Sequence, residues 1–238
     1  MKNTLGIARR QFVSYFNGAP AYIVISVVLL ITGFFFWQQF FLAKISSVRG
    51  MWMWLTWSMV IGAPALTMGL VADDRRTGTI ELLLTMPVKD GEVILGKFLG
   101  VLGLYAVLLT LTLTYPLSVS TLGPLDFGQV AAGYVGMFLL GAALLAIGLV
   151  TSSMTSNQMV AFFSSFIICF IFVILDKVLP LIGSEGIWPS IIEWLSFDYH
   201  RQSMARGVID LRDVTFFLAA TGIPLLIAFR ALESRRWR

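Results

Sequence analysis

The sequence predicts an all-α integral membrane protein with six transmembrane helices, an N-terminal amphipathic helix, a short helix in a cytosolic loop, and a short outer helix that is re-entrant or interfacial. Three observations predict this class. Of the 238 residues, 58% are hydrophobic and only 13% are charged, about half the charged share of soluble domains. Mean hydropathy is +0.85. Six apolar runs approach the ~20 residues that a membrane-crossing helix needs. We therefore expect residues 1–238 to form a single transmembrane domain.

The first segment, residues 1–20, has helical periodicity. In "NTLGIARRQFVSYF", apolar residues recur at helical spacing and polar residues lie opposite them. The apolar face consists of Leu5, Ala8, Phe12, Tyr15 and Phe16, and the polar face of Arg9, Arg10, Gln11 and Ser14. This pattern is typical of an amphipathic helix on the inner leaflet, with its arginines near anionic head groups. A helical extension of the first span would show the same pattern.

The six apolar runs are expected to cross the membrane. They cover residues 21–41, 53–72, 98–122, 130–150, 159–175 and 214–229. The last two are short, so these spans would be tilted, broken or extended by flanking residues. None of the six runs contains Asp, Glu, Lys, Arg or His. Ion-coupled carriers usually bury ionisable groups at mid-membrane depth, so the pattern disfavours such a carrier.

The distribution of positive charge predicts the orientation of the spans. With the N-terminus inside, eleven of the 17 Lys and Arg residues fall in cytosolic segments and six in outer segments. Cytosolic loops of membrane proteins carry an excess of Lys and Arg. Both termini are therefore expected in the cytosol.

The cytosolic loop between the second and third spans, residues 73–97, contains a near match to a nucleotide-binding motif. Gly91, Gly96 and Lys97 fit the pattern G-x-x-x-x-G-K-[ST], but Phe98 replaces the hydroxyl that binds Mg²⁺. The motif also continues into an apolar span instead of following a buried strand. We therefore predict a helix start at residues 91–97 and no ATP site on this chain. Gly96 and Gly100 would permit close approach of another helix.

The same loop, "ADDRRTGTIELLLTMPVKDGEVILGKF", carries a short apolar segment between two charged clusters. Thr77 or Thr79 can cap a helix with Glu81 in its first turn, and Pro87 ends it. The apolar residues are Ile80, Leu82, Leu83, Leu84 and Met86. A helix of one to two turns that is apolar nearly all round needs cover. Lipid, the chain's own bundle or a groove on a cytosolic partner would supply it.

This loop resembles the coupling loop of type-two ABC exporter permeases, whose pattern is an acid-rich segment, G-T-[IL]-E-x-L-L, a Pro, and G-K at the next span. The matching residues are Gly78, Thr79, Ile80, Glu81, Leu82, Leu83, Pro87, Gly96 and Lys97. Within that family the chain is more similar to the permease of the gliding-motility ABC exporters, through "PAYIVISVVLLITGFFFW", "SSMTSNQMVAF" and "RGVIDLRDVTFFL". Arg76 departs from the broader family, where many members have Glu, so a contact by that Glu is not expected here.

The resemblance implies a six-helix permease that pairs with a second copy or a homologous permease, above two copies of a separate ABC ATPase. ATP and Mg²⁺ would bind the ATPase, and this chain would hold no cofactor and no metal. The resemblance also implies a coupling helix in the loop. Its interface with the ATPase would comprise Thr79, Ile80, Glu81, Leu82, Leu83, Leu84, Met86 and Pro87. Gliding-type systems have a companion subunit with a large extracytoplasmic domain, and the implied location is the bacterial cytoplasmic (inner) membrane.

The third span carries a row of hydroxyl side chains on one helical face. The row consists of Thr110, Thr114, Ser118 and Thr121. These hydroxyls would line a translocation path, or else bond to other helices or to their own backbone. Tyr115 and Pro116 are expected to bend this helix. In the inner turn before the fifth span, Thr155 and Gln158 fit a capping box.

The longest outer segment, residues 176–213, is expected to form a short helix at "IWPSIIEWLSF". Ile187, Ile191, Trp194 and Leu195 recur at helical spacing, and Trp188 and Trp194 suit head-group depth. The helix would dip into the outer leaflet, cap an exit or bind the companion subunit, or the segment would be a plain interfacial loop. His200, the only histidine, is expected in a loop at the outer surface near Asp198. The sequence therefore predicts neither a catalytic constellation nor a histidine-based metal site.

These observations favour the membrane subunit of an ATP-driven exporter. The partner ATPases would move the helix at residues 80–86 and, through it, the bundle. An alternative is a membrane anchor or platform of an envelope or motility machine, which a partner ATPase remodels without transport. The sequence shows no nucleic-acid-binding signature. It leaves the substrate open among lipid, polysaccharide, peptide and small drug.

Overall fold

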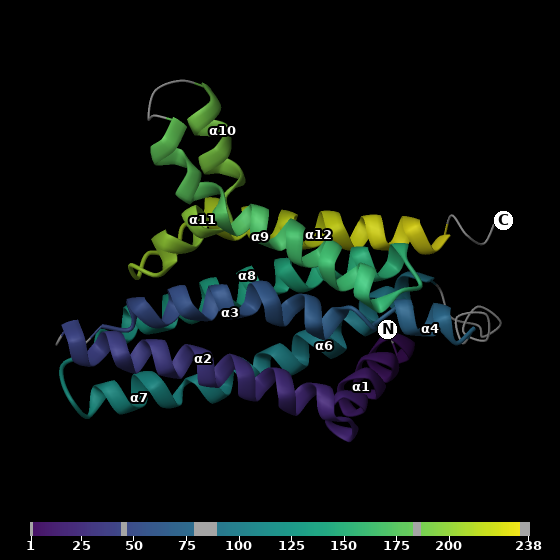
Figure 1. The fold of residues 1–238 in the computed structure, drawn as a ribbon, viewed down its shortest axis with the longest axis horizontal. Helices are drawn as coiled ribbons and strands as arrows, with labels where there is room; N and C mark the ends of the chain where they lie inside the picture. The colour runs from purple at the N-terminus through teal and green to yellow at the C-terminus, as the bar shows by residue number, and fades with distance from the viewer. Residues whose placement is uncertain (1, 44–46, 79–89, 183–186, 234–238) are drawn as a thin grey trace.

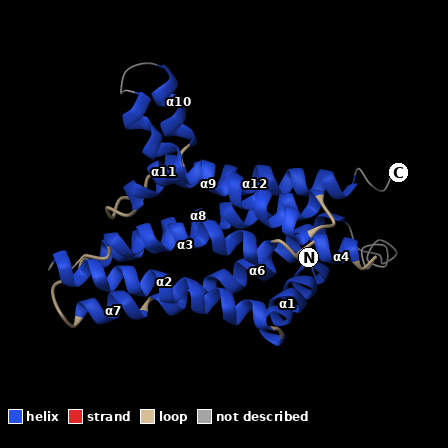
Figure 2. Cartoon of the chain, viewed as in Figure 1, coloured by secondary structure: helices blue, strands red, loops and turns tan. Residues whose placement is uncertain are grey.

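The computed structural model describes residues 2–43, 47–78, 90–182 and 187–233. Within these ranges all regular structure is helical, as Figures 1 and 2 show. The helices are α1 (Lys2–Asn17), α2 (Ala19–Ala43), α3 (Arg49–Thr67), α4 (Ala72–Arg76), α6 (Asp90–Thr112), α7 (Thr114–Ser120), α8 (Phe127–Met154), α9 (Gln158–Ile182), α10 (Ile187–Leu195), α11 (Phe197–Met204) and α12 (Leu211–Glu233). The predicted coupling helix at residues 80–86 lies outside the described residues.

Six helical segments of the described chain are long and apolar enough to cross a membrane, which confirms the predicted fold class and number of spans. They are Ala19–Leu42, Arg49–Arg76, Gly91–Ser120, Phe127–Met154, Gln158–Val178 and Leu211–Glu233. The two spans predicted to be short are extended by flanking residues, one of the three alternatives stated for them. Other spans are also longer than their apolar runs. The longer helices include charged residues near their ends, among them Asp73, Lys97 and Asp213. The apolar runs themselves contain no Asp, Glu, Lys, Arg or His.

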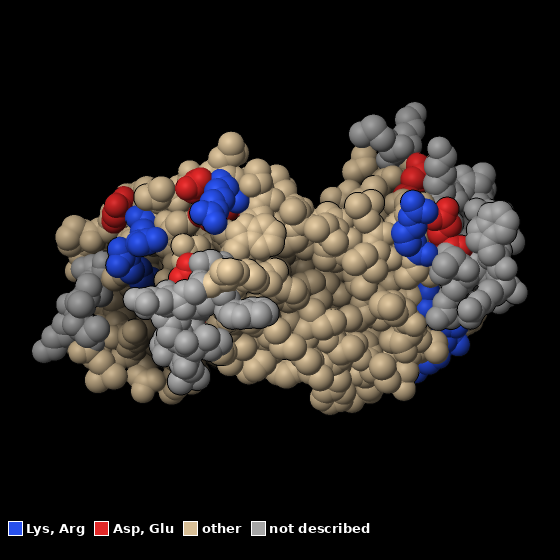
Figure 3. Space-filling model, turned by 90° about the horizontal axis from the view of Figure 1, so that it is seen from above, with Lys and Arg blue, Asp and Glu red and all other residues tan. Residues whose placement is uncertain are grey.

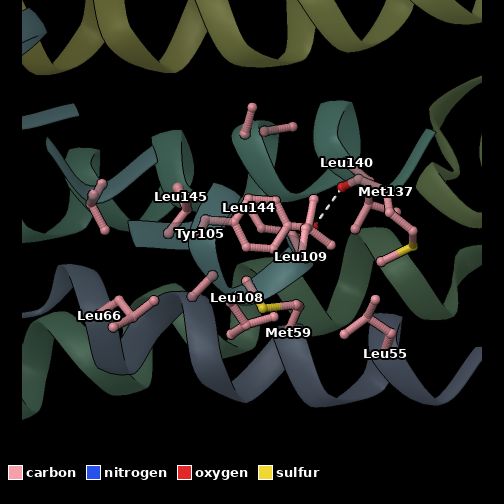
Figure 4. Packing of buried hydrophobic residues seen from close by; sticks show 14 of the residues in the cluster. Leu55, Met59, Leu66, Tyr105, Leu108, Leu109, Met137, Leu140, Leu144 and Leu145 are labelled. Atoms are coloured by element: carbon pink, nitrogen blue, oxygen red, sulfur yellow. Dashed lines mark hydrogen bonds between the residues drawn. The ribbon is translucent and has the colours of Figure 1, made fainter. Parts of the chain in front are cut away.

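Helix α8 occupies the centre of the bundle, where it contacts α3, α6, α9, α11 and α12. Residues 140–149 of α8 are all buried, and many of them are Gly or Ala. Small residues let neighbouring backbones approach closely. Figure 4 shows the core that results, in which Tyr105 of α6 donates a hydrogen bond of 2.6 Å to the carbonyl of Met137. Side chains of α3, α6 and α8 fill this core.

Two helix boundaries have a local cause, one in Asp126 and the other in Pro116. Asp126 caps α8 by accepting hydrogen bonds from the backbone N–H groups of Gly128 (2.9 Å) and Gln129 (3.3 Å). Helix α6 ends at Thr112 and α7 begins two residues later. Pro116 lies four residues after Thr112 and has no backbone N–H group. It therefore cannot donate the helical hydrogen bond to the carbonyl of Thr112. The predicted bend at Tyr115 and Pro116 is confirmed.

Charged residues gather at the two ends of the molecule in Figure 3, with an uncharged band between them. Helices α9 and α12 border this band with mostly exposed apolar side chains. An exposed apolar band of this kind is what a lipid-facing surface requires. The elongated bundle in Figure 1 therefore stands across the membrane, with the described ends of α1 and α12 near one face and α7 near the other.

Helix α1 is a separate element that packs on α6, and it is not an extension of the first span. A Cβ atom at Gly96 would lie 2.7 Å from Cβ of Ile7, and one at Gly100 would lie 2.7 Å from Cβ of Gln11. The predicted close approach at these two glycines is confirmed. The predicted polar face of α1 was wrong at one position, Gln11. Its side chain faces α6, where Gly100 leaves room for it. Leu5, on the predicted apolar face, is 65% exposed in the single chain.

Candidate functional site

The candidate site is the loop stem, which we define as α4 and the first two turns of α6, the described residues on either side of residues 79–89. The stem lies at the end of the bundle where the described chain begins and ends (Figure 1). Its sequence is polar before the loop and apolar after it. Contacts from α1, α8 and α9 hold these two halves together.

Ser152, near the end of α8, fixes the break between α3 and α4. Its hydroxyl oxygen accepts hydrogen bonds of 3.1 Å from the backbone N–H groups of Val71 and Ala72. The same hydroxyl donates to the carbonyl of Met68 at 2.9 Å. Backbone groups that a helix break leaves without partners are thereby satisfied inside the protein. Ser152 is fully buried, so it joins the end of α8 to the entry of the loop.

Lys97 ties the far side of the loop to the near side. It lies two turns inside α6, and its Nζ donates to the carbonyl of Leu70 and to the carboxylate of Asp74. The side chain of Lys97 is 9% exposed and that of Asp74 is 25% exposed. A buried ammonium requires partners of this kind. The ion pair therefore closes the stem across residues 79–89.

Asp73 extends the stem to α9. Its carboxylate accepts a hydrogen bond from Nε2 of Gln158, the first residue of α9. The predicted capping box is therefore wrong, because Gln158 reaches across to α4 instead of back to Thr155. Asn157 supplies the cap, since its Oδ1 accepts from the N–H of Met159 at 2.9 Å. The short turn between α8 and α9 thus holds both Ser152 and Gln158 against the loop entry.

Helix α1 supports the stem from the side. The hydroxyl of Tyr15 donates to the carbonyl of Leu66 at 2.5 Å, and burial raises the pKa of this phenol. At the other end of α1, Nδ2 of Asn3 lies 3.5 Å from Oε2 of Glu92. Helix α1 therefore contacts the chain both before and after the loop.

The loop departs from the stem at a glycine. Gly78 has φ of +71°, and a Cβ atom there would meet nothing within 4 Å. A positive φ rather than close packing explains why glycine stands here. The hydroxyl of Thr77 donates to the carbonyl of Asp73 at 2.8 Å. The helix that Thr77 or Thr79 was predicted to cap lies outside the described residues, so this cap stays a prediction. The predicted interface residues, from Thr79 to Pro87, lie outside the described residues.

The near match to a phosphate-binding loop is helical, as predicted. Helix α6 runs without interruption from Asp90 through Gly91 and Gly96. The motif is therefore a helix that begins at Asp90, and not the glycine-rich loop after a strand in which backbone N–H groups cradle a phosphate. Lys97 is also engaged by Leu70 and Asp74. In the described chain, the stem is thus a set of contacts that joins α4, α6, α8 and α9.

A second polar cluster surrounds α10 and α11 at the other charged end. We call these two helices the outer helical pair, after the side of the membrane that the sequence predicts for them. Lys177 lies 2.5 Å from a carboxylate oxygen of Asp176 and 3.0 Å from one of Asp198. Arg201 donates from Nε to Asp198 at 2.8 Å. Burial alone would raise the pKa of Asp198, but Arg201 and Lys177 outweigh it and lower this pKa. The predicted helix at α10 is present, and α11 is a second helix that the sequence did not indicate.

His200 is buried in α11, so its predicted place in an exposed loop was wrong. Its Nδ1 lies 2.6 Å from Oδ1 of Asp213, and its Nε2 lies 3.1 Å from the carbonyl oxygen of Trp194. The ring stacks on Phe216 with a centroid separation of 3.9 Å. Ser203 donates to the other oxygen of Asp213. The true partner is therefore Asp213, on α12, and the contacts join α10, α11 and α12.

The hydroxyl row of the third span lies on the exposed surface of the single chain. Each hydroxyl donates to a carbonyl three or four residues earlier in its own helix. The donor and acceptor pairs are Thr110 to Ala106, Thr114 to Leu111, Ser118 to Thr114, and Thr121 to Ser118. This is the back-bonding arrangement that the sequence left open. Lining of a translocation path by these residues stays a prediction.

The long apolar spans and the uncharged band define a multi-pass helical membrane protein. Several of its spans meet at the polar stem around one loop. Comparison with known proteins gives its family. The sequence model of the family described as ABC-2 family transporter protein matches residues 7–187. The chain belongs to this family of permeases.

Two curated relatives share the similarity. The chain is 25% identical over 170 residues to the probable multidrug ABC transporter permease YbhR of Escherichia coli strain K12, and equally to that of Escherichia coli O157:H7. The alignment covers 70% of this chain and 45% of each relative. The chain thus spans about half the length of the relatives it matches.

Sequence reasoning missed the side chains that build the stem, namely Ser152, Gln158 as a partner of Asp73, and Lys97 as a buried group. One signal was available for Lys97. It stands seven residues into a helix that otherwise turns apolar, so its ammonium had to find acceptors in a neighbouring element. Asp73 and Asp74 are the acids just before the loop. No comparable signal marked Ser152, because a serine near a helix end has many possible roles.

Proposed function

We propose that the chain is the membrane-spanning permease subunit of an ATP-driven ABC exporter, and that it couples ATP hydrolysis on separate ATPase subunits to movement of its helices. The observation that carries the proposal is the family match over residues 7–187, which includes the whole loop. The stem supports it, because contacts from α1, α8 and α9 converge on the two ends of that loop. A push on the loop would reach all of these helices at once.

The proposed assembly contains two permeases above two ABC ATPases, which hold ATP and Mg²⁺. Both termini would be cytosolic in a bacterial inner membrane, with the loop on the same side. The resemblance to gliding-motility exporters favours an additional companion subunit. The relatives are named as probable multidrug permeases, which makes small drugs one substrate class to test.

A platform without transport is the second candidate. The outer helical pair favours it, because an assembled outer surface can hold other envelope components. An ethidium efflux assay on cells with and without the chain separates the two ideas for small cationic dyes. Efflux that depends on the chain and on ATP supports the exporter.

The test of the coupling proposal uses the apolar segment of the loop. Affinity-tagged chain is purified from its native cells, and the associated ATPase and Mg-ATP hydrolysis are measured. A docked apolar side chain stabilises by roughly 1.5–3 kcal/mol, so Leu83→Asp should weaken ATPase association at least about tenfold. Lys89→Glu is the matched control in the same loop and should do much less. Wild-type association in Leu83→Asp, with loss in Lys89→Glu, would show that charge carries the contact.

A further inference from the structure

The outer half of α2 carries an aromatic groove that the proposed coupling does not use. It is an open hollow of about 530 Å³ between α2 and α7. It is lined by Leu29, Leu30, Gly33, Phe34, Trp37, Gln38, Phe41 and Tyr115. Its volume falls in the range of pockets that hold small molecules, ~300–1,000 Å³. Its lining contains no ionisable side chain apart from the phenol of Tyr115.

The floor of the groove is built by one contact between the helices. The hydroxyl of Tyr115 donates to the carbonyl of Leu29 at 2.8 Å. A Cβ atom at Gly33 would lie 2.8 Å from that hydroxyl oxygen, so only glycine lets Tyr115 reach across α2. The polar end of Tyr115 is thereby engaged, and its ring faces the hollow. The walls stand open, since Leu30 is 72% exposed and Phe34 is 67% exposed.

The side-chain amide of Gln38 is the polar side-chain group of the groove that has no hydrogen-bond partner in the described chain. Its amide is exposed and also lines a neighbouring hollow of about 470 Å³ between α2 and α3. An amide carries two N–H donors and one acceptor oxygen. In a lipid environment such a group is costly unless a partner satisfies it. The occupant of the groove therefore needs a polar atom at Gln38.

Depth in the membrane identifies the occupant. The span Ala19–Leu42 has 24 residues and is thus about 36 Å long, about 6 Å more than the hydrocarbon layer. If the span is centred, Gln38 lies about 3 Å inside the hydrocarbon edge, and Leu30 lies near the midplane. A phospholipid has its ester oxygens at about the depth of Gln38, and its acyl chain extends toward the depth of Leu30. The polarity of the groove, with Gln38 near the hydrocarbon edge and apolar side chains toward the midplane, matches such a molecule.

We propose that this groove holds one phospholipid from the leaflet opposite the described start of the chain, with its acyl chain against Gly33 and Trp37 and its ester oxygens on the amide of Gln38. The proposal rests on the membrane-spanning fold and not on the proposed coupling to an ATPase. A failed coupling experiment therefore leaves it untouched. The lipid would form part of the surface between α2 and α7.

The test uses the full chain in phosphatidylethanolamine nanodiscs that contain a trace of phospholipid with a photoactivatable diazirine on its acyl chain. Cross-linked residues are mapped by mass spectrometry. We expect labelling to concentrate on residues 29–41 and Tyr115. Leu30→Trp fills the groove and should reduce this labelling about tenfold, the loss that removal of one to two buried CH₂ contacts predicts. Leu226→Trp is the matched control, because Leu226 is a similarly exposed leucine (66%) on α12.

Two further variants distinguish the other occupants. Gln38→Leu should reduce labelling by the phospholipid several-fold and leave labelling by a diazirine alkane unchanged; equal loss with both probes would mean that the polar contact is absent. Gln38→Cys with Cys169→Ala tests for a second copy, and disulfide-linked dimers across the groove would overturn the proposal. Labelling of residues 29–41 no stronger than that around Leu226 would overturn it as well.

Discussion

The loop stem and the outer helical pair are both polar clusters at an end of the bundle, but they connect the chain in different ways. In the stem, Ser152 bonds to Val71 and Gln158 to Asp73, pairs that are 81 and 85 residues apart. In the outer pair, His200 and Asp213 are 13 residues apart, and Lys177 and Asp198 are 21 apart. The stem joins spans that are far apart in the sequence, whereas the outer cluster joins elements that follow one another along the chain. Disturbing the stem should therefore affect the whole bundle, and disturbing the outer pair should have a local effect.

The largest effect is expected from Lys97→Met. The change removes the buried ammonium that contacts the carboxylate of Asp74 and the carbonyl of Leu70, and losing one partner of a buried ion pair costs about 3–5 kcal/mol. We expect a loss of about 3 kcal/mol, because Asp74 keeps 25% exposure. Chemical unfolding in detergent measures this loss. Hydrogen exchange should rise in α4, α6 and α9 together.

Arg76→Met is the matched control for the stem. Arg76 lies 3.5 Å from Asp73 with 67% of its side chain exposed, and exposed pairs contribute about 0–1 kcal/mol. The two variants remove the same charge within one stem. Equal effects of Lys97→Met and Arg76→Met would show that the buried ion pair does not close the stem.

A smaller and local effect is expected from His200→Phe. Asp213 then keeps only Ser203, and a buried acceptor that loses its donor costs about 1–3 kcal/mol. Hydrogen exchange should rise in α10 and α11 and stay unchanged in α4 and α6. Tyr199→Phe, at an exposed neighbouring ring, should leave both regions at wild-type exchange rates. Faster hydrogen exchange in the loop stem of His200→Phe would contradict the expectation that a change in the outer helical pair has only a local effect.

The smallest effect is a pH dependence confined to the outer pair. The pKa of Asp198 is lowered in the folded chain. Its ion pairs therefore stabilise the outer helical pair in full at pH values above the usual aspartate pKa of about 4. This stabilisation is lost as the pH falls below about 4 and through the lowered pKa. Hydrogen exchange of α11, corrected for its intrinsic pH dependence, should show weaker protection at lower pH. Asp198→Asn should remove that dependence, and its persistence in this variant would assign it to another group.

The six spans could be predicted because a long apolar run has few alternatives to a transmembrane helix. The run placed some ends within one or two residues, such as the end of the first span and the start of the fifth. It missed others by more, since polar residues such as Asp73 and Lys97 continue the helices once partners satisfy them. Tyr115 and Pro116 were predicted correctly because a proline acts on its own helix. The face of α1 was wrong at Gln11, where the shape of α6 at Gly100 overrides hydrophobicity.

The polar contacts of the candidate site could not be predicted, because periodicity describes one helix at a time. Gln158 fits a capping box by spacing, but Asp73 on another element takes its amide. His200 has Asp198 as its nearest acid in sequence toward the N-terminus, yet it pairs with Asp213, which the turn after α11 brings back to it. Each error concerns a partner in another element and not the type of residue.

The packing of α1 on Gly96 and Gly100 sets an order for biosynthesis. Helix α1 is made before α6, and the glycines that receive Ile7 and Gln11 follow only after two spans. At about 5–20 residues per second, this delay is on the order of ten seconds. During that time the half of α1 that later faces α6 needs other cover, and the membrane surface provides it for an amphipathic helix. Helix α1 therefore has to lie on lipid first and move onto α6 when the third span inserts.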